Sequence, residues 1–290
     1  MRLQNFYFTS SRKYSELFIA TLAALLALMM VAALDGRVSA QAASPVVASS
    51  GRALAAVSAA SFRANEVAPE SIVAAFGSGL ATDAKVCETW PLPMNLAGTS
   101  VSLRDAAGQD FDAPLFFVAP TQVNFYLPPK VAAGEATVTV TSGDGSLSVG
   151  TVKVVEYAPG LFSMNGNGAG VAAGTALRIR GSAYYFETMA RFDLETNQWV
   201  TLPIEPGPSA DRVFVAFYGT GIRGRASLSE VTATLDGEPV SVSYAGAQGN
   251  FFGVDQINIE VPREMLGRGE VDFVTHINGK ESNAVKVNLK

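Results

Sequence analysis

The segment 193–197 has polar and acidic residues at alternate positions, and in this chain it most resembles a metal-binding sequence. Asp193, Glu195 and Asn197 have the one-three-five spacing of ligands in an EF-hand calcium loop. That loop also requires Gly at its sixth position and Glu at its twelfth, where this chain has Gln198 and Ile204. We therefore predict a solvated turn, with a weak calcium site of another type as the alternative. The same interpretation applies to three further acidic residues: Asp105, Asp110 and Asp112.

A single histidine and a single cysteine leave little for nucleophilic catalysis. A cysteine nucleophile needs a histidine partner, and the chain holds neither a Gly-x-Ser-x-Gly motif nor a His-Glu-x-x-His motif. Its carboxylates include no pair that the sequence singles out for glycoside hydrolysis. We predict that His276 ends a strand and that Cys87 is a small apolar loop residue. We also predict a protein that is not an enzyme and has no catalytic, cofactor-binding or metal-binding residues.

A glycine-rich run at 166–170, Gly-Asn-Gly-Ala-Gly, could be taken for a loop that holds a phosphate. A dinucleotide-binding loop must lead from a strand into a helix, so that the helix amides face the pyrophosphate. Strand-like sequence follows at 176–180 instead, so we predict no nucleotide and no other cofactor. The net charge of −5 also gives no sign of the basic patch that a nucleic-acid binder shows.

Four aromatic residues are the best candidates for contact with a ligand. Tyr184, Tyr185, Phe186 and Trp199 lie in a central segment that has no counterpart elsewhere in the chain. An exposed row of aromatic side chains would suit sugar stacking or protein contact. The alternative is that these residues bury a hairpin against the rest of the protein.

The elements that would position these residues are strands, and one strand motif occurs twice. Residues 121–128 read Thr-Gln-Val-Asn-Phe-Tyr-Leu-Pro, and residues 255–262 read Asp-Gln-Ile-Asn-Ile-Glu-Val-Pro. Apolar and polar residues alternate in both, which predicts a strand with one face on a core and the other toward solvent or another polar surface. Three more pairs of blocks recur in the same order: 73–80 with 215–222, 134–136 with 269–271, and 152–154 with 285–287.

The repeat and its turns predict an all-β protein of two immunoglobulin-like β-sandwich domains, related by internal duplication and joined by a β-hairpin-rich insertion. Asp144-Gly145, Asp236-Gly237 and Asn278-Gly279 are hairpin signals, because a type I′ turn needs positive φ at both central positions. The predicted parts are a signal peptide or anchor at 1–43, a linker and first edge strand at 44–66, domain 1 at 67–157, the β-rich insertion at 158–212 and domain 2 at 213–290.

The N-terminus has the order of a secretory signal. Arg2, Arg12 and Lys13 precede an apolar run at 17–34, and small residues follow at 38–43. We predict cleavage after residue 40 or 43, with an uncleaved membrane anchor as the alternative because the run nearly reaches the length of a membrane span. Either outcome predicts export to the periplasm, cell surface or exterior. Contact with the membrane is predicted only through this segment, if it is not cleaved.

Several blocks together resemble a known family. The blocks that carry the resemblance are 68–80, 115–128, 159–174 and 218–223. With them, the chain from 58 to 290 resembles the uncharacterised C-terminal domain that is abundant in Solibacter and other Acidobacteria, and each half more loosely resembles IPT/TIG-type domains. The resemblance implies an exported β-sandwich module, and it supplies no catalytic residues because none are established for the family.

Export, duplication and the missing catalytic motifs together predict a non-enzymatic interaction or adhesion-type module that binds an unidentified protein or polysaccharide. One alternative is a carbohydrate-binding module or carbohydrate-active enzyme that uses the central aromatic segment. Another is a structural spacer. Fold alone does not decide among them.

Overall fold

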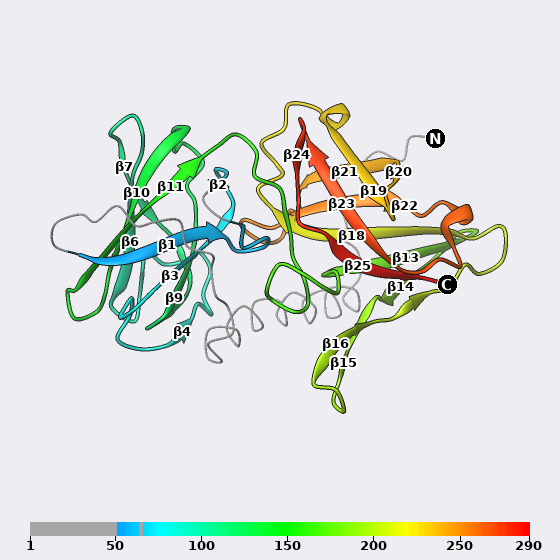
Figure 1. The fold of residues 1–290 in the computed structure, drawn as a ribbon, viewed down its shortest axis with the longest axis horizontal. Coiled ribbons are helices and arrows are strands. Elements are labelled where there is room, and N and C mark those ends of the chain that lie inside the picture. The colour runs from blue at the N-terminus through cyan, green and yellow to red at the C-terminus, as the bar shows by residue number, and fades with distance from the viewer. Residues whose placement is uncertain (1–50, 64–65) are drawn as a thin grey trace.

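Strands dominate the computed structural model, which describes residues 51–63 and 66–290 (Figure 1). The predicted all-β class is confirmed, since the described elements other than strands are two short 3-10 segments. Two groups of sheets lie side by side: the first unit, residues 52–157, and the second unit, residues 158–290 (Figure 1). In the described part of the chain no helix is both long and apolar enough to cross a bilayer. The predicted signal peptide lies outside the described residues.

Strand β1 (Arg52–Ser58) links the two layers of the first unit. Its first two residues pair in parallel with β11 (Leu147–Val154), and from Leu54 onward it pairs antiparallel with β3 (Ile72–Gly77). The strand path is β4-β8-β9-β3-β1-β11-β10-β6-β5, with β2 beside β11 and β7 beside β6. The strands are β1 (Arg52–Ser58), β2 (Glu66–Val67), β3 (Ile72–Gly77), β4 (Lys85–Val86), β5 (Asn95–Leu96), β6 (Thr99–Arg104), β7 (Asp110–Ala113), β8 (Leu115–Ala119), β9 (Gln122–Tyr126), β10 (Gly134–Thr141) and β11 (Leu147–Val154).

The structure differs here from the predicted linker and edge strand at 44–66. Strand β1 is not an edge strand, because it lies between β3 and β11. Its alanine-rich sequence shows no clear alternation, so the sequence pattern hides it. Gly150 in β11 explains how the two strands approach each other, since a Cβ at that position would overlap the Leu54 carbonyl oxygen.

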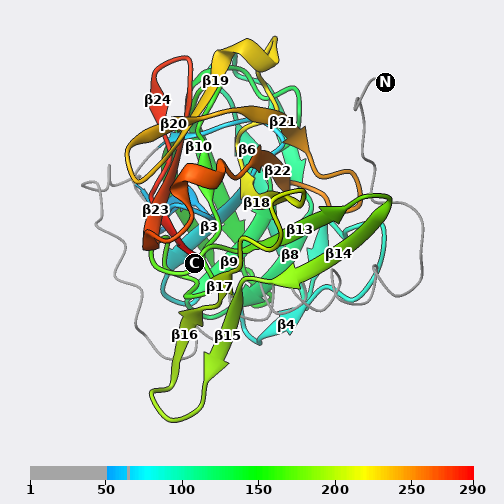
Figure 2. The ribbon, with the colours of Figure 1, turned by 90° about the vertical axis from the view of Figure 1, so that its right-hand side faces the viewer.

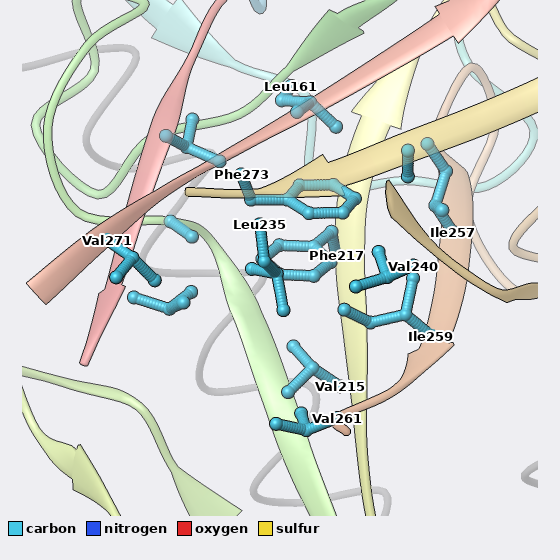
Figure 3. Close-up of a cluster of buried hydrophobic side chains, with 14 of the residues drawn as sticks. Leu161, Val215, Phe217, Leu235, Val240, Ile257, Ile259, Val261, Val271 and Phe273 are labelled. Atoms are coloured by element: carbon cyan, nitrogen blue, oxygen red, sulfur yellow. The ribbon is translucent and has the colours of Figure 1, made fainter. Parts of the chain in front are cut away.

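The second unit is built from two facing sheets. One has the order β14-β13-β18-β22-β21 with β12 beside β18, and the other has the order β17-β25-β23-β19-β20 with β24 beside β23. Their core includes the stacked rings of Phe217 and Phe273, whose centroids lie 3.7 Å apart (Figure 3). The elements are β12 (Gly160–Leu161), β13 (Gly174–Arg180), β14 (Ala183–Thr188), β15 (Ala190–Asp193), β16 (Gln198–Thr201), β17 (Pro203–Ile204), β18 (Arg212–Thr220), η1 (Leu228–Glu230), β19 (Val231–Leu235), β20 (Glu238–Val240), β21 (Val242–Ala247), β22 (Asp255–Glu260), η2 (Arg263–Met265), β23 (Gly269–Ile277), β24 (Lys280–Glu281) and β25 (Val285–Leu289).

The segment 158–212, predicted as a connecting insertion, is largely part of the second unit. Strand β13 pairs with β18 over six residues, from Gly174 opposite Phe217 to Ile179 opposite Arg212, and β14 extends the sheet. The hairpin of β15 and β16 stands apart from the larger sheets (Figure 2). Strand β1 holds the matching place beside β3 in the first unit, but its alanine-rich sequence does not resemble that of β13. Comparison of the chain with itself therefore could not place β13.

The two copies of the strand motif have matching positions. Strand β9 pairs with β3 so that Gln122 lies opposite Phe76, and β22 pairs with β18 so that Gln256 lies opposite Tyr218. In each copy the glutamine Nε2 donates to the asparagine Oδ1 two residues further on, at 2.8 Å in β9 and 2.6 Å in β22. The polar face is not turned to solvent, because Gln122 and Gln256 are both buried.

For a second pair of repeated strands, the structure changes the alignment that the sequence predicts. Ala136 of β10 lies opposite Val152 of β11, and Val271 of β23 lies opposite Val287 of β25. If Ala136 corresponds to Val271, as the sequence predicts, then Val152 corresponds to Val287 and not to Val285. The valine-rich sequence of both strands allows a match two residues out of register, because side chains keep the same face over that step.

A shared apolar cluster joins the two units. This junction cluster consists of Val57, Ala59, Ala60, Ile72, Ala74, Phe162, Met164, Val171, Ala173, Tyr218 and Val254. Thr220 lies beside it, fully buried, with its hydroxyl accepting from the Ile72 backbone N–H at 2.9 Å and donating to the Gly253 carbonyl at 2.6 Å. One hydroxyl thus connects the two units.

We expect Thr220→Val to lower the free energy of unfolding by about 2–4 kcal/mol, because it keeps the volume but leaves a buried donor and a buried acceptor unpaired. Urea unfolding of the two proteins measures the difference. Thr188→Val, at an exposed position of β14, is the matched control and should change stability by less than about 0.5 kcal/mol. Equal stability of Thr220→Val and the wild type would contradict the proposed role of the hydroxyl.

Candidate functional site

Two loops from different units bring exposed aromatic side chains together. Trp90 comes from the loop between β4 and β5, Phe252 comes from the loop between β21 and β22, and their side chains are 62% and 44% exposed. Their ring centroids lie 4.4 Å apart in an edge-to-face arrangement. Phe252 also contacts the ring of the buried Tyr126, with the centroids 5.3 Å apart. We call Trp90, Phe252 and Tyr126 the junction aromatics.

Charged side chains from both units continue from the junction aromatics. The Tyr126 hydroxyl donates to Glu70 Oε1 at 3.2 Å, and Arg223 Nη1 lies 3.7 Å from the same oxygen. Arg223 Nε donates to Asp255 Oδ1 at 2.6 Å, while its Nη2 donates to the Val254 carbonyl at 2.7 Å. These contacts run continuously from a surface carboxylate to a fully buried one.

The buried end of this network is held by the backbone. Asp255 Oδ2 accepts from the N–H groups of Ile222 and Arg223, at 2.7 and 3.3 Å. Burial raises the pKa of the Asp255 carboxyl, against the opposite effect of the Arg223 guanidinium and these N–H groups. Burial, and then the Glu70 carboxylate, raises the pKa of the Tyr126 phenol, so Tyr126 remains a neutral donor at neutral pH.

The backbone at Glu70 is in an unusual conformation. Pro69 and Glu70 occupy the central positions of a turn in which the Ser71 N–H donates to the Ala68 carbonyl at 3.2 Å, and φ of Glu70 is 63°. A turn with proline first and positive φ second prefers glycine or asparagine at the second place. Glu70 therefore projects its carboxylate from a backbone conformation that glutamate rarely adopts.

The four aromatic residues singled out in the sequence do not form one row. Tyr184 and Tyr185 are 45% and 48% exposed, but as neighbours in β14 they point to opposite faces of the sheet. Tyr185 lies under the Arg180 guanidinium at 5.9 Å. Phe186 and Trp199 are half-buried, and Trp199 packs on the junction cluster and contacts the ring of Phe192.

Sequence reasoning missed the junction aromatics. A signal was present, because Trp90 and Phe252 lie in the two loops that interrupt the alignment of the repeated sequence blocks. What the sequence does not show is that these loops, from different units, meet.

The acidic segments make turns. Asp193 Oδ1 accepts from the N–H groups of Glu195 and Thr196, and Asp105 accepts from three backbone N–H groups, one of them that of Ala132 at 2.9 Å. These hydrogen bonds lower the pKa of both carboxyls. Over 51–63 and 66–290, no group of three or more His, Cys, Asp or Glu side chains is placed to hold a metal ion.

The remaining candidates have structural surroundings. His276 Nε2 lies 3.2 Å from Glu281 Oε2 on β24, and the half-buried Cys87 donates to the Thr89 carbonyl. In the glycine run the Gly168 carbonyl accepts from Asn283 Nδ2 at 2.8 Å. A Cβ on Gly168 would overlap Ser61. The run therefore packs the first unit against the second.

Comparison with known proteins identifies no family. No family model and no curated protein matches the chain, so the resemblance to the Acidobacteria domain stays a prediction. Among solved structures it is similar to the Bacteroides ovatus mixed-linkage glucan utilization locus SGBP-B in complex with a mixed-linkage heptasaccharide, with a TM-score of 0.31 and 12% identity over 78% of this chain and 43% of that chain. It is similar to bovine butyrophilin with a TM-score of 0.22 and 9% identity, over 78% of this chain and 94% of that chain. The chain thus spans less than half of the SGBP-B chain, and neither likeness assigns it a ligand.

Proposed function

We propose that this protein is an exported, non-enzymatic binding module that holds a polysaccharide or a protein at the junction of its two units. The observation that carries this proposal is the exposure of Trp90 and Phe252, which come from different units and contact each other at the surface. Exposed aromatic side chains on a rigid base are the usual anchors of binding surfaces. The charged pair of Glu70 and Arg223 adds polar contacts at the same place.

The proposal includes an origin for the two units, as immunoglobulin-like sandwiches derived from one duplicated unit. The shared register of β9 and β22 with their partner strands supports it, as does the repeated Gln-to-Asn hydrogen bond. Export is proposed from the sequence of the N-terminus. The partner strands of β9 and β22, which are β3 and β18, both contribute side chains to the junction cluster beside the proposed binding surface.

We expect Trp90→Ala to weaken binding about thirtyfold, which corresponds to the loss of about 2 kcal/mol that is typical of a central aromatic anchor. The chain serves as bait for an envelope extract and for a panel of soluble polysaccharides, and each retained ligand is then titrated by calorimetry. Leu147→Ala, an exposed residue of the first unit away from these loops, is the control and should bind like the wild type.

Two outcomes would contradict this proposal. Turnover of a glycan, ester or peptide by the purified protein, abolished by a point substitution, would show an enzyme. Binding that survives Trp90→Ala but disappears with Tyr185→Ala would move the site to the hairpin segment.

A further inference from the structure

We infer that the junction binds a saccharide, with Trp90 and Phe252 against the sugar rings and with Glu70 and Arg223 hydrogen-bonded to two adjacent hydroxyl groups. This inference rests on the proposed function and deepens it by naming the chemical class of the ligand. Three observations support it: the arrangement of the rings, the unused hydrogen-bonding atoms beside them, and the backbone conformation of Glu70.

The two rings are set at a steep angle to each other, and both residues remain partly exposed. Trp90 and Phe252 meet at an interplanar angle of 67°, so their exposed surfaces form a corner. The face of an aromatic ring is electron-rich and attracts the polarised C–H groups that line one side of a pyranose. Tyr126, in contact with Phe252, closes the base of this corner and leads to the charged pair.

The charged pair presents an acceptor next to a donor. Glu70 Oε1 accepts from Tyr126, and within the described residues no hydrogen bond is recorded to its Oε2. The Nε and Nη2 atoms of Arg223 are bonded to Asp255 and Val254, whereas Nη1 makes, among residues 51–63 and 66–290, only the 3.7 Å contact with Glu70. A sugar hydroxyl can donate and accept at once, so one hydroxyl of a vicinal diol can donate to Glu70 while its neighbour accepts from Arg223.

A saccharide matches this combination better than a peptide does. A peptide that adds to a sheet needs a free strand edge, and an acidic peptide needs a surplus of positive charge. The junction instead offers aromatic rings beside one carboxylate and one guanidinium, and this guanidinium also faces the buried Asp255 carboxylate, so the pair presents no surplus of positive charge. Arg223 is fixed by Asp255 and the backbone, so its free donor is already oriented before a ligand arrives.

The third observation is the residue type at the Ala68–Ser71 turn. Glycine would satisfy the positive φ of residue 70 without strain, yet the chain has glutamate there. Strain kept at a surface residue points to a use for its side chain. The Glu70 carboxylate lies within contact of both Tyr126 and Arg223, at the edge of the proposed sugar site.

Glu70→Gly separates binding from stability. We expect its thermal midpoint to stay close to that of the wild type, because the relief of backbone strain offsets the loss of the hydrogen bond that Tyr126 donates to Glu70. We expect its affinity for the retained polysaccharide to fall about ten- to a hundredfold, through loss of a charge-assisted hydrogen bond. Glu70→Asn, which tolerates the same φ but carries a shorter side chain, should behave likewise and provides a second test.

The chemical class of the ligand is tested with intact and oxidised polysaccharides. Affinity electrophoresis is run in gels containing a β-1,4-glucan, a xylan, a mannan or a polygalacturonate, each before and after periodate cleavage of its vicinal diols and reduction of the resulting aldehydes. We expect retardation by at least one intact polysaccharide and none by its oxidised form.

Equal retardation by the oxidised polysaccharide, or wild-type affinity of Glu70→Gly, would overturn this inference. If no polysaccharide binds but an envelope protein is held in a Trp90-dependent manner, the proposed function stands and the saccharide assignment fails. If nothing binds in a Trp90-dependent manner, both fail.

Discussion

Asp255→Ala is expected to lower the free energy of unfolding by about 3–5 kcal/mol. The Asp255 side chain is fully buried and accepts hydrogen bonds from Arg223 Nε and from two backbone N–H groups. Removing it leaves the Arg223 guanidinium, which is only 14% exposed, without its closest counter-charge. Because Arg223 then no longer has a fixed orientation, ligand binding at the junction should weaken as well.

Urea unfolding followed by circular dichroism measures the loss. Asp272→Ala is the matched control, because it removes a carboxylate from an ion pair with Lys286 in which both side chains are about half exposed. The control should cost less than about 1 kcal/mol. Comparable losses in the two variants would show that the buried pair of Asp255 and Arg223 stabilises the fold no more than an exposed ion pair does.

Phe273→Ala is expected to cost about 3–5 kcal/mol, through lost apolar burial and the cavity that remains. Phe273 is completely buried between the two sheets of the second unit, and its ring stacks on Phe217 with an interplanar angle of 2° (Figure 3). Leu194→Ala removes an apolar side chain that is 87% exposed and should be nearly neutral. A loss below about 1 kcal/mol at Phe273 would mean that the core closes around the gap.

Local features of the fold could be predicted from the sequence because local chemistry determines them. Asp236 and Gly237 have φ values of 53° and 79°, and Asn278 and Gly279 have values of 47° and 80°, as a type I′ turn requires. At Asp144-Gly145 only the glycine has positive φ, at 82°, so this hairpin does not have the predicted type I′ turn. The alternation of the Gln-x-Asn motifs likewise predicts their strands. The burial of Gln122 and Asn124 was not predictable, because it depends on a covering surface from distant parts of the chain.

The candidate site depends on long-range contacts, and these escaped sequence analysis. Nothing near Trp90 in the sequence indicates Phe252, and nothing near Glu70 indicates Arg223. The strand β13 was placed in an insertion because its partner, β18, lies beyond the β14–β16 hairpins. Pattern analysis finds strands, whereas pairing between distant segments decides which of them become neighbours.

The junction cluster fixes the relative position of the two units, and this limits which extended ligands the molecule can engage. Ile72 and Tyr218, from different units, share this cluster, and the Thr220 hydroxyl bonds to backbone atoms on both sides of the boundary. The two units therefore do not swing about a flexible tether. If the hairpin segment also makes contact, the distance between the two contacts is set by the fold, and avidity would select ligands whose repeat length matches that distance.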